Sequence, residues 1–257
     1  MAIIKFLYNN LWDASGTVLT SSSEAAGFPD TRTQHRWKTR CWRSDTDTAE
    51  WIKVDLGLGT QDIKALVIKN HNFTSAATLY LQGNATDAWG APTVDVDLTG
   101  LITADTIVYF WTSSQNLRWW RIYIDDGANT DTYVKIGRVF LGSYFEPASN
   151  FANNTIGLMD PSGIKHSTGG QYSANEKTHF KTISWGFRGL TEADKDSFIT
   201  VYDAVGMSGN YFICEDSADA APYTVTFYVR NTSKWEFPLI KPGVTLRTGI
   251  ITVETLR

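Results

Sequence analysis

The chain contains 257 residues, of which 42% are hydrophobic and 19% are charged, and its formal net charge is −4. This length allows one large domain or two of ordinary size, and high hydrophobicity with low charge excludes intrinsic disorder. The acidic balance argues against nucleic acid as a partner. No run reaches the roughly 18 apolar residues that membrane insertion of a helix needs.

The N-terminal half is predicted to be a series of short strands. After an opening strand, strands are expected at 51–57, 65–70, 77–84, 94–98, 106–111, 118–124 and 133–142. Short strands separated by Gly, Asn and Asp, with no helical period between them, favour a jelly-roll β-sandwich. Abundant aromatic residues agree, because aromatic side chains fit a pleated sheet.

The strand at 118–124 is unusually aromatic on both faces. Its two-residue period places Trp120, Ile122 and Ile124 on one face and Trp119, Arg121 and Tyr123 on the other. We expect the first face to be core. The second face would be prone to association if it were exposed, so we expect a partner or the second domain to cover it.

The segment 143–178 is the least periodic part of the chain and is rich in Pro, Gly, Asn and Ser. Such clusters mark turns and extended connections. The sequence therefore predicts an N-terminal domain at 1–147 and a smaller C-terminal domain at 148–257, with an extended connection over 148–178.

The C-terminal half is predicted to be a smaller α+β domain, with one helix packed on an antiparallel sheet. Strands are expected at 179–190, 211–216, 223–231, 233–240 and within 245–256. The helix is expected over 192–205, between Thr191 as N-cap and Gly206 as C-cap. Phe198 and Tyr202 keep helical spacing and are predicted to lie in the core.

No pattern of catalytic or metal-binding residues emerges. The four histidines lie outside any recognisable nucleophile motif. Asp95 and Asp97 share a strand face, but a calcium cage needs six or more oxygen ligands. Cys41 and Cys214 lack partner spacings for zinc, and a disulfide framework is not expected. We therefore expect no enzyme activity, no catalytic residue, no metal and no cofactor.

One loop stands out in the N-terminal half. Residues 32–43, RTQHRWKTRCWR, hold five positive charges, two Trp and no acid. The loop could stack on sugars or hold an anion. Alternatively, one Trp plugs the sandwich and the arginines neutralise nearby acids, namely Asp45, Asp47, Glu50 and Asp55. If the chain binds carbohydrate, the predicted site residues are Trp37, Arg40 and His71.

The N-terminal half resembles a discoidin domain, also called the coagulation-factor 5/8 type C domain, among the galactose-binding-like jelly rolls. The matching motifs are TRCWRS (39–44), EWIKVDLG (50–57), ALVI (65–68), LYLQGNATDAW (79–89), LRWWRIYI (117–124) and KIGRVFLG (135–142). The resemblance implies sugar or lipid-headgroup binding through loops at one end of the barrel. It also implies that Trp42 and Trp51 are structural, and we add Trp120 to this core. The family's flanking cysteines are absent.

The C-terminal half resembles the minor tail and distal tail proteins of long-tailed bacteriophages. The resemblance rests on the order strand, capped helix and further strands, within KTISWGFRGLTEADKDSFITVYDAVGMSGNYFICEDS, TVTFYVRNTSKWEF and ITVETL. It implies a homo-oligomeric ring at the tail tip that joins the tail tube to the hub and fibres.

Two hypotheses follow. The first is a structural virion protein of a tailed phage or prophage, assembled in the bacterial cytoplasm, whose C-terminal half builds a ring and whose N-terminal half docks fibres or contacts a host surface glycan. The alternative is a free carbohydrate-binding, lectin-like protein.

Overall fold

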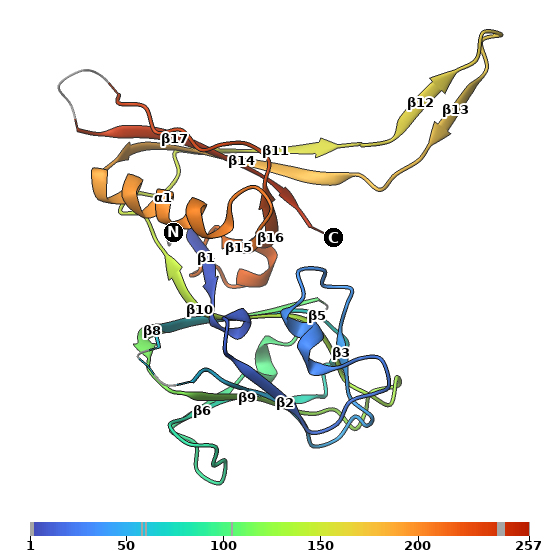
Figure 1. Cartoon of the computed structure of the whole chain (residues 1–257), viewed down its shortest axis with the longest axis vertical. Coiled ribbons are helices and arrows are strands. Elements are labelled where there is room, and N and C mark those ends of the chain that lie inside the picture. The colour runs from blue at the N-terminus through green and yellow to red at the C-terminus, as the bar shows by residue number, and fades with distance from the viewer. Residues whose placement is uncertain (1–2, 58, 60, 104, 241–244, 257) are drawn as a thin grey trace. The chain divides into compact units, whose positions relative to one another are not determined.

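The computed structural model describes residues 3–57, 59, 61–103, 105–240 and 245–256 (Figure 1). The chain divides into two compact units. The sandwich unit comprises Asn9–Tyr144 and Ala220–Thr224, and the α+β unit comprises Met1–Tyr8, Phe145–Asp219 and Val225–Arg257. The sequence places the boundary after residue 147, whereas the chain here passes from the first unit to the second after Tyr144.

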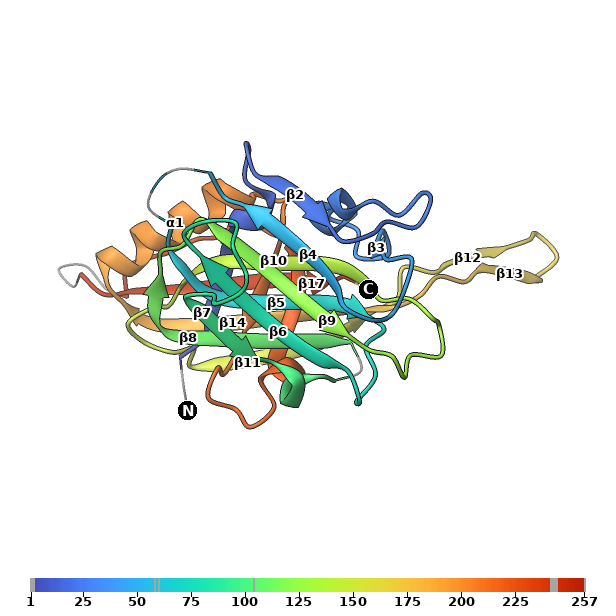
Figure 2. The same ribbon diagram turned by 90° about the horizontal axis from the view of Figure 1, so that it is seen from below.

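One sheet of the sandwich unit is five-stranded and antiparallel. Its order is β2 (Val18–Ser21), β4 (Glu50–Asp55), β9 (Trp119–Asp125), β6 (Thr78–Asn84) and β7 (Val94–Asp97), as Figure 2 shows. Alternate residues of β4 and β9 are fully buried, among them Ile52, Val54 and Ile122. This alternation is typical of an antiparallel sheet with one face on the core and one toward solvent.

The facing sheet completes the sandwich. Strand β10 (Lys135–Phe145) pairs with β5 (Ile63–His71), β5 pairs with β8 (Thr106–Gln115), and the short β3 (Trp42–Arg43) pairs with β10. Buried side chains from both sheets form one hydrophobic cluster. The only helical turns described in this unit's own segment Asn9–Tyr144 are short: η1 (Leu11–Asp13), η2 (Asp30–Gln34) and η3 (Thr99–Leu101). The predicted mainly-β fold with a jelly-roll sandwich is confirmed.

The predicted core tryptophans of this unit divide into two groups. Trp42 and Trp120 are fully buried, and their indole N–H groups donate to the carbonyls of Ser23 and Leu117, each at 3.0 Å. Trp51 is only partly buried and lies on the outer face of β4. The prediction of Trp51 as a core residue is therefore wrong, because its neighbours in the two-residue period take the inner positions.

The sheet of the α+β unit is also antiparallel. Its order is β11 (Asn153–Met159), β14 (Phe180–Leu190), β17 (Arg247–Thr255), β16 (Thr226–Asn231), β15 (Asn210–Cys214) and β1 (Lys5–Asn10). Lys5–Leu7 of β1 pair with Phe212–Cys214 of β15. The first residues of the chain thus complete the C-terminal sheet, although the sequence assigned them to the N-terminal domain.

The helix of this unit, α1 (Glu192–Val205), has the predicted bounds. The hydroxyl of Thr191 accepts from the backbone N–H of Asp194 at 3.1 Å, and the Asp194 carboxylate accepts from the backbone N–H of Thr191 at 2.9 Å. This reciprocal pair satisfies two N–H groups that a helix start leaves without partners.

Phe198 anchors α1 in the core of the unit. Its ring centroid lies 5.3 Å from those of Phe6, Phe187 and Phe237, all within the range of favourable aromatic contacts. The prediction of Tyr202 as a core residue is wrong, because Tyr202 is only partly buried and packs at the edge of this cluster, 5.3 Å from the ring of Trp235.

Two other segments differ from the sequence-based expectation. Residues 233–240 form no regular strand; they make single bridges, Glu236 to Ile250 and Leu239 to Arg247. Pro238 lies between these bridges and cannot donate to a ladder. The connection at 148–178 contains β11 and a hairpin of β12 (Gly163–His166) and β13 (Tyr172–Asn175), which Figure 1 shows extending beyond the sheet. Every residue of the hairpin strands is exposed, so no period marks them in the sequence.

Candidate functional site

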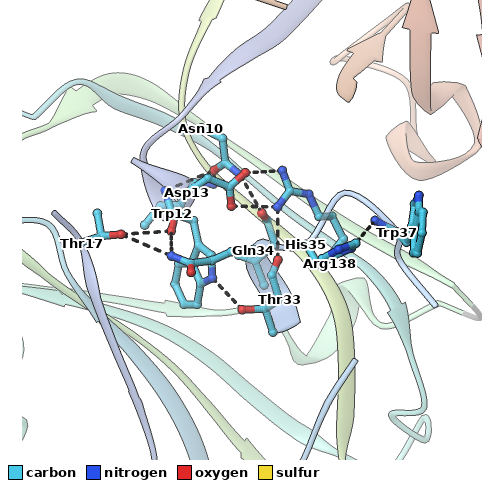
Figure 3. Close-up of polar contacts among 11 residues, drawn as sticks. Asn10, Trp12, Asp13, Thr17, Thr33, Gln34, His35, Trp37 and Arg138 are labelled. Atoms are coloured by element: carbon cyan, nitrogen blue, oxygen red, sulfur yellow. Dashed lines mark hydrogen bonds and ion pairs between the residues drawn. The ribbon is translucent and has the colours of Figure 1, made fainter. Parts of the chain in front are cut away.

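The basic loop, residues 32–43, is fixed to the sandwich unit at its first turn. Figure 3 shows Arg138 of β10 forming a two-pronged ion pair with Asp13, with one guanidinium–carboxylate distance of 2.7 Å. The same guanidinium donates to the carbonyl of Thr33 at 3.3 Å. Trp12 donates from its indole to the hydroxyl of Thr33 at 2.9 Å. These contacts hold the 3₁₀ turn η2, from which the loop emerges.

A second attachment lies further along the loop. The side-chain amide of Asn70 donates to the carbonyl of Lys38 at 2.6 Å. That carbonyl also approaches β10 so closely that a Cβ on Gly137 would lie 2.1 Å from it. Only glycine permits such an approach without movement of the backbone. The segment between η2 and Lys38 is therefore held at both ends.

Trp37 projects from this held segment and is 52% exposed. The guanidinium carbons of Arg40 and Arg36 lie 4.9 Å and 5.8 Å from the centroid of its ring. The His35 ring lies 5.1 Å away on a tilted plane. Cations at these distances are attracted to the indole π-face and restrain the ring. We call these four residues, 35–37 and Arg40, the Trp37 platform.

The environment of His35 favours the neutral imidazole. Burial lowers its pKa most, and the positive charges of Arg40, Arg36, Arg138 and Arg32 lower it further. Its Nδ1 accepts from the backbone N–H of Trp37 at 3.0 Å. A neutral imidazole that accepts at Nδ1 carries its proton at Nε2. His35 therefore offers one hydrogen-bond donor beside the indole.

Only two of the three predicted site residues lie close together in the structure. Trp37 and Arg40 lie together, but His71 is only 6% exposed, and its ring stacks on Phe73 at 4.6 Å. Its Nδ1 accepts from the backbone N–H of Phe73 at 3.2 Å, and burial lowers its pKa to about 4. Among the described residues, no hydrogen bond or ring contact joins His71 to the platform, so its assignment to a binding site is not supported.

The platform also contains residues that the sequence-based prediction did not name. His35 and Arg36 directly precede Trp37 in the chain, and this proximity was the available signal. Arg43 does not join them. Its guanidinium carbon lies 3.4 Å from the ring centroid of Tyr133 and 5.6 Å from that of Phe28, between two aromatic rings.

The alternative interpretation of the loop is right in one respect. Trp42 is fully buried in the core of the sandwich, as that interpretation expects. The nearby acids, however, have other partners: Asp55 pairs with Arg118 at 2.6 Å, and Glu50 accepts from the hydroxyls of Ser22, Ser23 and Thr46. The exposed arginines of the platform therefore do not serve to neutralise these two carboxylates.

The loop between β6 and β7 contacts the outer faces of β4 and β9. Asp87 of this loop pairs with Lys53 of β4 at 2.6 Å and accepts from the indole N–H of Trp89 at 2.6 Å. The Trp89 ring lies 4.6 Å from the guanidinium carbon of Arg121. Trp119, Arg121 and Tyr123 are each partly buried, and the loop contacts this face at Arg121.

Over the described part of the chain, no three side chains of His, Cys, Asp or Glu gather as they would around a metal ion. Within the same residues, α1 is the longest helix, and no helix is both long and apolar enough to cross a membrane. Cys41 and Cys214 are both buried as free thiols.

No protein-family profile matches the sequence, and none of the curated proteins compared with it is significantly similar. Solved structures of carbohydrate-binding modules are similar over the N-terminal half. A Streptococcus pneumoniae fucose-binding module has 11% identity and a TM-score of 0.43, covering 53% of this chain and 99% of its own. Chitosan-binding module 1 of a chitosanase/glucanase from Paenibacillus sp. IK-5 has 19% identity and a TM-score of 0.40, covering 52% and 99%.

A family 32 module from Clostridium perfringens NanJ, solved with galactose, has 11% identity and a TM-score of 0.38, covering 56% of this chain and all of its own. Similarity at this level decides neither the ligand nor the role of this chain.

Proposed function

We propose that the chain is a non-enzymatic carbohydrate-binding protein whose sandwich unit holds a sugar against Trp37. The observation that supports this most directly is an indole that is 52% exposed on a loop attached to the sandwich at both ends. A restrained and exposed aromatic ring offers a ligand a flat surface in a fixed orientation, as aromatic side chains do in small-molecule sites. The C–H face of a pyranose ring fits a flat aromatic surface.

The polar groups around the indole also suit a sugar. Arg36 and Arg40 each offer guanidinium donors, and His35 adds its Nε2 proton. Sugar hydroxyl and ring oxygens can accept from all three residues. A few placed polar groups beside an apolar surface are the usual composition of a small-molecule site.

Titration of the full chain with a panel of soluble oligosaccharides tests the proposal. Trp37→Ala should weaken binding by about tenfold or more, or ~1.4 kcal/mol, because it removes the stacking surface. Tyr223→Ala is the matched control, since Tyr223 is also an exposed aromatic residue, at 38%. Equal affinity of Trp37→Ala and the unmodified chain for every sugar that binds would refute the platform.

We further propose that the α+β unit assembles the chain into a ring at the tip of a phage tail, which places the protein in the virion. The support is a set of exposed apolar side chains on β11 and on the β12–β13 hairpin: Ile156, Leu158, Met159, Ile164 and Tyr172. Strand β11 is also the last strand of its sheet. An edge strand and a hairpin with exposed apolar side chains both favour association with another chain.

In this second proposal, neighbouring copies cover the hairpin, and tube, hub and fibre proteins are the further partners. Multi-angle light scattering of the purified chain and of Leu158→Asp tests it. The unmodified chain should form closed oligomers, and Leu158→Asp should reduce them to monomers. Ile199→Asp, on the exposed side of α1, is the control that should leave assembly intact. A monomeric unmodified chain that binds sugar would favour the free lectin.

A further inference from the structure

The arginines of the basic loop differ in their contacts and in their exposure. Arg43 is held between Phe28 and Tyr133, and the guanidinium carbon of Arg32 lies 5.0 Å from the Phe28 ring centroid. Arg36 and Arg40 are exposed, and their guanidinium carbons lie 5.8 Å and 4.9 Å from the centroid of the Trp37 ring. Arg40 forms no ion pair with any carboxylate among the residues that the structure describes.

Positive charge beside a sugar platform is unnecessary for a neutral sugar. Neutral hydroxyls are recognised equally well by Asn, Gln or Ser, whereas an arginine fork matches a carboxylate, sulfate or phosphate with two parallel hydrogen bonds. The loop holds five cationic residues and no acidic one, in a chain whose net charge is −4. The loop is therefore a local positive patch on an acidic protein.

The electrostatic effect of this patch is visible at His35. Four arginines lower the pKa of its imidazole, in addition to the effect of burial. The largest of these charge effects come from Arg40 and Arg36. The same two arginines lie over the Trp37 ring, and the His35 ring lies 5.1 Å from that ring.

We propose that the ligand of the Trp37 platform is an acidic glycan, one whose sugar carries a carboxylate, sulfate or phosphate group that Arg36 and Arg40 bind while the pyranose ring stacks on Trp37. This inference rests on the proposed carbohydrate-binding function and specifies its substrate class. His35 donates from Nε2 to a neutral sugar oxygen in this arrangement.

Isothermal titration of the full chain with paired oligosaccharides of equal length tests the inference. Oligogalacturonate is compared with neutral galactan, sulfated with desulfated heparin-type oligosaccharide, and a glycosylated glycerol-phosphate oligomer with its dephosphorylated sugars. At least one acidic member should bind about tenfold tighter than its neutral partner at low salt. That preference should decrease as salt screens the charges.

Two charge-removing variants make the test specific. Arg40→Gln and Arg36→Gln should each reduce affinity for the acidic member about threefold to fivefold, as expected for an exposed ion pair, and reduce affinity for neutral sugars less, so that the preference for the acidic member falls. Arg188→Gln is the matched control, because Arg188 is exposed on β14 outside the basic loop. Thermal melts of all variants check that each is folded.

The outcomes separate the inference from the proposed function. Equal binding of acidic and neutral partners, lost in Trp37→Ala, overturns the acidic preference and keeps carbohydrate binding. No sugar binding by the intact chain overturns both. A single-stranded oligonucleotide of equal charge is the last probe, and tighter binding of it than of any acidic glycan would assign the patch to nucleic acid instead.

Discussion

The carbonyl oxygen of Lys38 lies against the Cα of Gly137, so that the basic loop and strand β10 touch backbone to backbone. This contact and the amide of Asn70 hold the loop close to the sheet. Gly137→Ala would place a methyl carbon 2.1 Å from the carbonyl and 2.8 Å from the Asn70 side chain. We expect this substitution to displace the loop and to destabilise the protein by about 1–3 kcal/mol, as overpacking usually does.

Denaturant melts and sugar titrations of Gly137→Ala check that expectation. Affinity for the sugar should fall with stability, because the displaced loop no longer restrains Trp37. Gly163→Ala is the control, since a Cβ there meets no atom within 4 Å. Unchanged stability of Gly137→Ala would mean that the contact between loop and strand is not maintained in solution.

Phe198→Ala should lower the free energy of unfolding of the α+β unit by about 3–5 kcal/mol, as a large-to-small change in a packed core. Phe198 is fully buried and contacts four phenylalanine rings and one tryptophan ring. Ile199→Ala, one residue along the helix but 43% exposed, should cost much less. A loss below about 1 kcal/mol for Phe198→Ala in denaturant melts would contradict the packing of α1 on the sheet.

Asp30→Asn should make stability less dependent on pH. Burial and the nearby charge of Glu24 raise the pKa of Asp30 to about 6 from an ordinary value of 3.8. The folded state therefore favours the protonated acid, and this contribution to stability is lost as pH rises from about 4 to about 6. Denaturant melts of the unmodified chain should show a decline over that range, which Asp30→Asn reduces by an amount on the order of 1–2 kcal/mol. An equal decline in both proteins would show that another group causes it.

His71→Asn tests the opposite sign of pH dependence. The buried imidazole has a pKa of about 4, below its ordinary value of 6.5, so the folded state favours the neutral ring. Its contribution to stability is complete above pH 6.5 and is lost as pH falls toward 4. Asn retains an acceptor for the Phe73 N–H and does not titrate, so the variant should lose less stability than the unmodified chain on acidification. Its sugar affinity at pH 7 should be unchanged, and a large loss would restore His71 to the site.

Local signals in the sequence were sufficient to predict the position and the ends of α1. Thr191, Asp194 and Gly206 are neighbours of the helix ends that they cap, and the apolar period lies within the helix itself. The signals that assign the inner and outer faces of β4 and β9 are equally local, because they consist of alternation along one strand. The resemblance of the N-terminal motifs to discoidin domains added the sandwich architecture and the buried position of Trp42.

Features that depend on distant segments could not be predicted in this way. Nothing near Lys5–Leu7 specifies that they pair with Phe212–Cys214 rather than with a strand of the N-terminal half. Trp51 was placed in the core by the resemblance to discoidin domains, although its own alternation places it outside. The hairpin at 163–175 has no buried face, so it lacks the apolar period that reveals most strands.

The sequence by itself determined the mainly-β class, the single capped helix and the presence of one basic, tryptophan-containing loop. These depend on composition and on spacings of a few residues, which the chain keeps in any environment. Only the tertiary structure decided that Trp37, Arg36 and Arg40 share one exposed platform while Arg43 and His71 are packed away. The reason is physical: whether a side chain meets solvent or a neighbouring ring depends on which strands lie beside its loop, and here β10 and β5, from distant parts of the chain, hold the loop in place.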